Sequence, residues 1–290
     1  MTSRCALPNR AILRLTGEDT RPFLQGLITN DINALSTQPA IFAAMLSPQG
    51  KFQHDFFLIR DGDDILLETE FPLADALQKK LKRYKLRSKV TITDESNQWH
   101  IYAEWGEDKP CHSRESGNPA FPDPRHPALG IRILSHTPLD ATAPYEAYDQ
   151  HRLQLGIPSG AADASERAVI MELGYDQLHA ISFTKGCYVG QEVTARMHYR
   201  NILRKCLYII TADNPLPAIG TPITRADNEK PVGEMRSSNG TIGLALLRIE
   251  AAQSTLPLYA NGLTLTATLP PYMTEKITAI HEAGAAHPPS

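Results

Sequence analysis

The chain has few of the features that mark secreted, membrane-spanning or metal-binding proteins. Its 290 residues include four cysteines, and none forms a C-x-x-C pair or combines with histidine at the spacing of a zinc or iron–sulfur ligand set. No resident metal is therefore expected, and free thiols favour a cytoplasmic location. No apolar run is long enough to span a bilayer. The first ten residues lack the apolar centre of a signal peptide.

Charge of one sign is not in excess either. The formal net charge is −3, so no global field attracts the chain to a membrane or to nucleic acid, and we expect neither as a direct partner. Hydrophobic residues make up 42% of the chain, which is typical of a globular protein. The length is sufficient for two or three domains with buried cores.

The hydrophobic pattern predicts an α+β protein. Alternating and helical spacings predict strands over residues 11–15, 41–46, 52–59, 65–69, 90–93 and 100–103, and helices over residues 19–29, 74–86 and 145–155. After residue 204, short extended runs separated by Gly, Pro and Asn-Gly turns predict a small β-barrel.

Two segments differ in composition from the rest. Residues 107–127 contain five prolines and few aliphatic side chains, which predicts a loop insertion or a disordered segment. The C-terminal sequence EAGAAHPPS predicts a disordered tail.

One octet combines residue types that a buried core does not need. It reads Lys185-Gly186-Cys187-Tyr188-Val189-Gly190-Gln191-Glu192 and lies between two strand-like segments. Gly186 and Gly190 leave room for a ligand or a tight backbone path. Most free cysteines are small buried apolar groups, and that remains the alternative for Cys187. The surrounding polar groups favour a functional thiol instead, and Lys185 would favour the thiolate if it faces Cys187.

This octet follows LGYDQLHAISF and precedes an A-R-x-x-x-R segment, and together they resemble the YgfZ family of folate-binding proteins. That family is related to the T-protein, the aminomethyltransferase of the glycine cleavage system. The resemblance extends to the segments GEDTRPFLQGLITND, SPQGK and YDQHRLQLGIP, whereas residues 109–128 have no counterpart.

The resemblance implies a T-protein-like fold with two interleaved α+β units and a C-terminal small β-barrel. The first unit would combine residues 1–36 and 140–203, which include the loop that carries Cys187. Residues 37–139 would form the second unit, with the proline-rich insertion near 107–128. Residues 204–280 would form the barrel, and residues 281–290 the tail.

The resemblance also implies that tetrahydrofolate, or a one-carbon derivative, lies in a central channel. The family's pterin-side aromatics fall on Tyr148 and Arg10; a guanidinium can still stack on a ring, and a core tyrosine is the alternative for Tyr148. From the residues alone, Tyr188 could supply a second flat face. Gln191 and Glu192 could pair with the amino-pyrimidine edge. An ion pair from Glu192 to Arg196 or Arg200 is the alternative.

The function implied is that of an accessory factor for iron–sulfur cluster assembly or repair, which indirectly supports tRNA modification. Its partners would be iron–sulfur proteins or their assembly machinery. Cys187 would be the reactive thiol, acting as a transient cluster ligand, a sulfur carrier or a nucleophile. A folate-dependent aminomethyl- or methyltransferase and a non-catalytic folate-gated scaffold are the alternatives, and turnover is left open.

A run of seven basic residues within eleven, Lys79 to Lys89, closes the predicted helix over residues 74–86. A solvated helix face explains it most simply. As sharper hypotheses, Lys82, Arg83 and Lys85 could bind the glutamate tail of a folate or an RNA phosphate.

Overall fold

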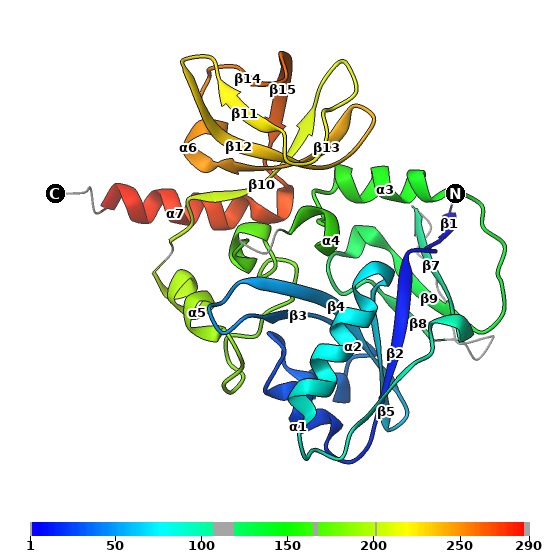
Figure 1. Ribbon diagram of the computed structural model, residues 1–290. Coiled ribbons are helices and arrows are strands. Elements are labelled where there is room, and N and C mark those ends of the chain that lie inside the picture. The colour runs from blue at the N-terminus through cyan, green and yellow to red at the C-terminus, as the bar shows by residue number, and fades with distance from the viewer. Residues whose placement is uncertain (1, 107–118, 165–167, 201, 287–290) are drawn as a thin grey trace. The chain divides into compact units, whose positions relative to one another are not determined.

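The computed structural model describes residues 2–106, 119–164, 168–200 and 202–286 (Figure 1). Its backbone contacts divide the chain into two compact units. Unit 1 comprises residues 1–49, 53–148 and 178–191, and unit 2 comprises residues 50–52, 149–177 and 192–290. The three-part division expected from the sequence stays a prediction.

The larger sheet of unit 1 has five strands in the order β3-β4-β5-β2-β6. Their bounds are β2 Arg10–Thr16, β3 Ala40–Leu46, β4 Phe52–Asp61, β5 Asp64–Glu70 and β6 Thr91–Asp94. Helix α2 (Phe71–Lys85) packs on β2, β5 and β6. Its buried side chains Ala74, Leu77 and Leu81 recur at helical spacing, which explains why this helix was predictable.

The smaller sheet of unit 1 has four strands in the order β1-β7-β9-β8. Their bounds are β1 Thr2–Ala6, β7 His100–Gly106, β8 Ala120–Pro122 and β9 Ile131–Ser135. Strand β9 pairs antiparallel with both β7 and β8. Unit 1 also contains α1 (Thr20–Gln25) and the short 3-10 helices Ile32–Ser36, Ser96–Gln98 and Pro127–Leu129.

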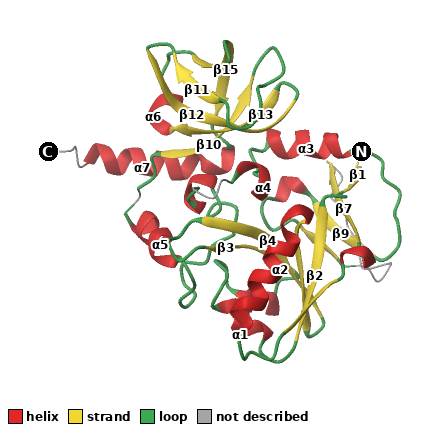
Figure 2. Ribbon diagram, in the orientation of Figure 1, coloured by secondary structure: helices red, strands yellow, loops and turns green. Residues whose placement is uncertain are grey.

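Unit 2 contains a closed six-strand barrel in the order β10-β13-β12-β11-β14-β15. The strands are β10 Lys205–Thr211, β11 Pro222–Arg225, β12 Asn228–Asn239, β13 Ile242–Arg248, β14 Leu258–Ala260 and β15 Leu263–Thr268. Closure leaves the sheet without a free edge. The predicted β-barrel is therefore confirmed (Figure 2).

The remaining described part of unit 2 contains helices joined by loops and turns (Figure 2). Helix α3 (Tyr145–Gln154) begins in unit 1 and continues into unit 2. The others are α4 Gly160–Asp163, α5 Gln191–Tyr199, α6 Ile249–Ala252 and α7 Thr274–Ala286, with 3-10 turns at Ile170–Leu173 and Pro271–Met273.

Several local predictions are wrong. The octet does not lie between strands: residues 178–183 before it form no strand, and the segment after it belongs to helix α5. Val193 and Met197 are one helical turn apart, a spacing that fits a helix as well as a strand. Helix α7 extends to Ala286, so the predicted tail is helical up to that residue. In the proline-rich stretch, residues 107–118 lie outside the described residues, but residues 119–128 include β8 and a 3-10 turn.

Over the described ranges, no helix combines the length and the apolar character needed to cross a membrane.

Candidate functional site

Backbone hydrogen bonds fasten the cysteine loop, residues 178–191, to the chain that follows α1. Val189 donates its amide hydrogen to the Gly26 carbonyl over 3.2 Å, and Ser182 donates to the Thr29 carbonyl over 3.0 Å. The Thr29 hydroxyl in turn donates to the Ala180 carbonyl over 2.6 Å. The loop is thus tied in its first third and near its end, all within unit 1.

Lys185 makes the most concentrated of these contacts. Its Nζ donates to the carbonyl oxygens of Gln25 and Ile28, each at 2.7 Å, and of Asn30 at 2.8 Å. An ammonium group has three hydrogens to donate, so all are used. Gln25 is the last residue of α1, where helix carbonyls lack intrahelical partners. Burial lowers the pKa of Lys185 to about 8.

The sequence predicted that Lys185 would favour the thiolate of Cys187 if it faced that residue. In the structure its ammonium gives all three hydrogens to backbone carbonyls, so none is left to donate to a thiolate. It also lies 5.1 Å from the centre of the Tyr188 ring, close enough for a cation–π interaction. Lys185 therefore holds the loop in place.

Cys187 lies exposed on this fastened loop, in contrast to Cys5 and Cys206, which are buried. Burial raises the pKa of Cys5 to about 11 and that of Cys206 to about 12, so both remain thiols at neutral pH. The buried apolar alternative suits those two cysteines and does not describe Cys187. Cys111 lies outside the described residues.

The two glycines of the octet differ in what their backbone requires. Gly190 has φ +84°, a conformation that L side chains rarely adopt. Gly186 does not have a positive φ, and a Cβ added there would meet no atom within 4 Å. The fold therefore needs glycine at Gly190 but not at Gly186, beside the exposed thiol.

The other predicted ligand groups of the octet already have partners. Gln191 Oε1 accepts a hydrogen bond from the Tyr188 amide over 3.1 Å. The carboxylate of Glu192 accepts from Arg196 over 3.0 Å, one helical turn along α5, and its side chain is 88% exposed. The ion-pair alternative for Glu192 is thus confirmed.

A second polar group in unit 1 is a buried ionic cluster, which we call the arginine cluster: Arg10, Glu68, Asp123, Arg125 and Arg132. Glu68 accepts from Arg10 Nε over 2.8 Å and from Arg132 Nε over 3.1 Å. Asp123 Oδ2 lies 2.7 Å from Arg125 Nη2 and 3.5 Å from Arg132 Nη1. Three guanidinium groups and two carboxylates leave one net positive charge.

Electrostatics keep these buried acids ionised. Burial alone would raise the pKa of Glu68, but Arg132 and Arg10 hold it below its ordinary value. The same balance, with Arg125 as the main partner, holds the pKa of Asp123 below its ordinary value. Removing either carboxylate would leave arginines buried without compensation.

Tyr148 belongs to the same group of side chains. Its hydroxyl accepts from Arg125 over 3.2 Å and from Arg132 over 3.5 Å. Its ring centre lies 5.5 Å from that of Trp105, and the residue is only 7% exposed. The core-tyrosine alternative fits these contacts, and little of the ring is open for stacking.

Arg10 is paired as well. Its guanidinium carbon lies 5.7 Å from the centre of the Phe57 ring, and the corresponding distance for Arg132 is 4.3 Å. Arg10 thus lies over an aromatic ring of the chain itself, and its predicted stacking on a pterin stays a prediction.

Sequence reasoning placed Arg10 and Tyr148 at the site but missed Glu68, Asp123, Arg125 and Arg132. Asp123 and Arg125 stand in the proline-rich stretch, which was interpreted as a loop insertion or a disordered segment. Glu68 was hidden because it interrupts an otherwise ordinary strand, Ile65 to Thr69. A charged residue inside a buried strand was the available signal.

Some basic side chains of the run on α2 have partners, and others do not. Lys85 Nζ donates to the Val90 carbonyl over 2.5 Å, and Lys79 pairs with Asp75 over 2.6 Å. Neither the Lys82 nor the Arg83 side chain makes a hydrogen bond or ion pair to the described residues, and both are exposed. Of the predicted anion-binding set, Lys85 already has a partner.

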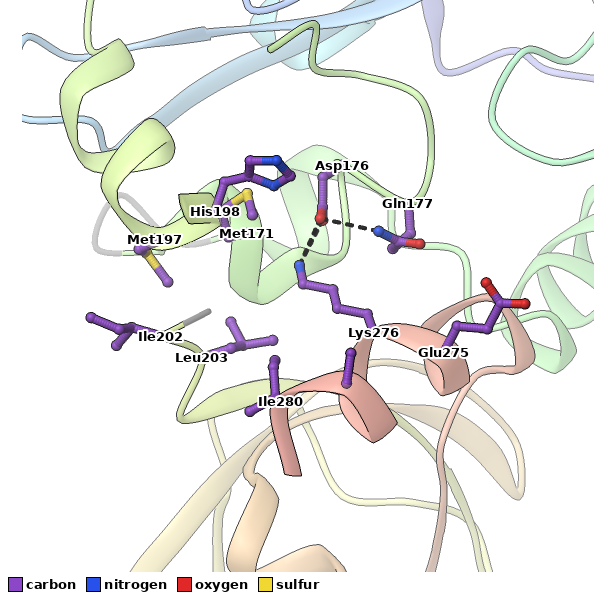
Figure 3. Close-up of a pocket in the computed structure, with 11 residues that line it drawn as sticks. Met171, Asp176, Gln177, Met197, His198, Ile202, Leu203, Glu275, Lys276 and Ile280 are labelled. Carbon is purple, nitrogen blue, oxygen red and sulfur yellow. Dashed lines mark hydrogen bonds and ion pairs between the residues drawn. The ribbon is translucent and has the colours of Figure 1, made fainter. Parts of the chain in front are cut away.

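Unit 2 contains a hollow that the sequence did not predict, with a volume of about 290 Å³ (Figure 3). Lys276 and Asp176 form an ion pair of 2.8 Å on its wall, and Gln177 donates to the same carboxylate. Apolar side chains, including Met171, Met197 and Leu203, line much of the rest. Among the described residues, no three His, Cys, Asp or Glu side chains gather as metal ligands.

Comparisons with known proteins agree with this architecture. A family profile described as "CAF17, C-terminal beta-barrel domain" matches residues 204–275. The "Iron-sulfur cluster assembly factor IBA57, mitochondrial" of Mus musculus is 33% identical over 294 residues, which cover 90% of this chain and 82% of that protein. The Homo sapiens protein of the same name is 32% identical, with 91% and 83% covered. The chain belongs to the IBA57 family.

The octet suggested the YgfZ family, to which the IBA57 family is related. The predicted resemblance is therefore confirmed at the level of related families, and the family of this chain is IBA57. The aminomethyltransferase T of the glycine cleavage system from Bartonella henselae superposes with a TM-score of 0.74 at 12% identity, covering 93% of this chain and 86% of that one. This confirms the T-protein-like fold. The expected cytoplasmic location is contradicted, because these IBA57 relatives are named as mitochondrial proteins.

We predict that Lys185→Met lowers the free energy of unfolding by about 2 kcal/mol, because three carbonyl acceptors lose a charged donor. Urea unfolding of both proteins measures this change. Lys82→Met serves as the matched control, since Lys82 is exposed and its loss should change stability by less than about 0.5 kcal/mol. Equal stabilities of the two variants would contradict the role given to Lys185.

We predict that iodoacetamide modifies Cys187 in the native protein, whereas Cys5 and Cys206 react only after unfolding. The experiment uses a Cys111→Ser background, and peptide mass spectrometry measures the extent of modification. Native modification of Cys5 or Cys206 at the rate of Cys187 would contradict this account.

We predict that Glu68→Gln lowers the free energy of unfolding by about 3 kcal/mol or more, because Arg10 and Arg132 lose their shared counter-charge. The exposed Glu192→Gln is the matched control and should cost less than about 1 kcal/mol. The folded pKa of Glu68 is depressed, so its contribution is present above the ordinary carboxyl pKa of about 4.3 and is lost as pH falls through the lower folded value. If the difference in free energy of unfolding between wild type and Glu68→Gln stays constant across this pH range, the role given to the ionised Glu68 is contradicted.

Proposed function

We propose that this chain is an iron–sulfur cluster assembly factor in which Cys187 is the reactive thiol and tetrahydrofolate, or a one-carbon derivative, is the bound cofactor. The observation that supports the proposal most is the placement of the thiol. Cys187 is exposed on a loop whose neighbouring residues are held by six hydrogen bonds, whereas Cys5 and Cys206 are buried. The IBA57 relatives are named iron–sulfur cluster assembly factors, and for this reason we propose an iron–sulfur cluster as the group that Cys187 binds.

A single thiolate cannot hold a cluster, because iron–sulfur clusters are held by several protein ligands. The described residues offer no further group of metal ligands around Cys187. We therefore assign Cys187 the part of a transient ligand, with the remaining ligands supplied by a partner protein. The sulfur-carrier and nucleophile hypotheses stay open predictions.

The open space at Gly186 is consistent with such a partner. No protein atom lies within 4 Å of a Cβ placed there, so the absence of a side chain serves nothing inside the described fold. A protein or cluster that approaches Cys187 would benefit from that absence.

The folate proposal rests on fewer contacts. Glu192 does not fit the role of a pterin partner, because it is exposed and paired with Arg196. The arginine cluster fits an acidic ligand better: it has one net positive charge, and the side chains of Arg10 and Arg125 are 12% and 11% exposed. Bound folate would supply a one-carbon carrier, and Arg10 and Arg125 would attract its carboxylates.

The link to tRNA modification is proposed only through the iron–sulfur enzymes that carry it out. A folate-dependent transferase remains the alternative, since the likeness to the aminomethyltransferase shows the fold alone.

The test of the proposed function is rescue of cells that lack their IBA57 relative. We expect Cys187→Ala to abolish recovery of a [4Fe–4S] enzyme's activity, measured against an iron-free enzyme of the same compartment, with unchanged melting temperature. Calorimetry with tetrahydrofolate under anaerobic conditions should give the same affinity for Cys187→Ala as for wild type. Full rescue by Cys187→Ala would disprove the role of the thiol, and absence of binding by both proteins would disprove the folate proposal separately.

The two glycines provide a paired prediction. Gly186→Ala should leave the melting temperature unchanged but reduce rescue, because its new methyl group meets only an approaching partner. Gly190→Ala should lower stability by about 1 kcal/mol or more, because its φ is positive. If Gly186→Ala rescues as well as wild type, the space beside Cys187 is not used.

A further inference from the structure

The end of helix α2 presents an unusual apolar side chain. Leu86 follows the last helical residue, Lys85, and is 85% exposed, the highest value among the exposed large hydrophobic residues that the structure describes. Its backbone has φ 45° and ψ −108°, which is strained for a residue with a Cβ. The chain thus projects an apolar side chain into solvent from a conformation that glycine would adopt more easily.

Basic side chains surround this leucine. Lys82, Arg83 and Arg87 are exposed, stand within four positions of Leu86, and their side chains make no hydrogen bond or ion pair to the described residues. We call Lys82, Arg83, Leu86 and Arg87 the basic tip.

Neighbouring charges leave the region strongly positive. Lys85 bonds a carbonyl and keeps its charge, and Lys89 pairs with Glu18. Asp19 accepts from the amide of Lys89. Five basic side chains and two acids therefore give a local charge of +3, opposite in sign to the net charge of the chain.

We infer that the basic tip docks on an anionic phospholipid surface, with Leu86 inserted among the headgroups. Lipid headgroups supply diffuse negative charge, and the interface below them accepts a single protruding apolar side chain. This contact is peripheral and needs no membrane-spanning helix. It revises the expectation of no membrane partner, which was drawn from net charge rather than from local charge.

The composition of the basic tip favours a lipid surface over a protein partner and over a nucleic acid. A stable protein interface buries about 800 Å² on each side around an apolar centre. Leu86 has no comparable exposed apolar neighbour, because Tyr84 is half-buried and Phe71 lies at the opposite end of α2. A nucleic-acid backbone would attract the cations but would gain nothing from the leucine.

The test is co-sedimentation of the full chain with vesicles of phosphatidylcholine that contain phosphatidylserine, compared with vesicles of phosphatidylcholine alone. Lys82→Gln/Arg83→Gln/Arg87→Gln removes the free cations. Leu86→Gly removes the apolar group and is compatible with the positive φ, so the fold should be retained. Ile219→Ala is the matched control for an exposed apolar residue, and Lys79→Gln for a lysine already paired with Asp75.

We expect binding to the anionic vesicles only, and weaker binding as salt is raised. The triple variant should bind about 100-fold more weakly, and Leu86→Gly about tenfold more weakly. Both controls should bind like wild type. The inference is overturned if wild type does not bind anionic vesicles, or if the triple variant or Leu86→Gly binds them equally well. Binding to an RNA duplex or to polyglutamate, without binding to vesicles, also overturns it.

Discussion

The ammonium group of Lys185 is the contact on which the presentation of the thiol depends. It joins the cysteine loop to three carbonyls at and beyond the end of α1, a segment more than 150 residues earlier in the chain. The bonds from Val189 and Ser182 reinforce the same junction. Because these contacts hold the residues on either side of Cys187, the thiol is exposed without being part of a freely moving segment.

The arginine cluster gives the same unit a second constraint of a different kind. Arg132 contacts Glu68 and Asp123 and so joins three separate strands and loops through buried charge. Such a cluster adds little net stability compared with apolar packing, but losing one member is costly. Within the cluster as defined, guanidinium groups outnumber carboxylates by one, and for this reason the carboxylates of the proposed folate are placed beside it.

Several parts of this fold were predictable, and the reason lies in their local patterns. The hairpin of β4 and β5, the amphipathic α2 and the barrel strands all show regular hydrophobic spacing and clear turn residues. The octet identified Cys187. The three carbonyl partners of Lys185 could not be predicted, because every residue has a backbone carbonyl and the sequence does not show which of them accept. Likewise, the ionic role of Asp123 and Arg125 could not be predicted, because it depends on Arg132 and on Glu68, which is distant in sequence.

The central claim is that Lys185 holds the loop that presents Cys187, and native-state hydrogen exchange tests it most directly. The amides to follow are those of Ser182 and Val189, which donate to Thr29 and Gly26. We predict protected amides in wild type and much faster exchange in Lys185→Met, with the barrel strands β10 and β13 unchanged in both. Unprotected Ser182 and Val189 amides in wild type would contradict the claim, as would equal protection in the two proteins.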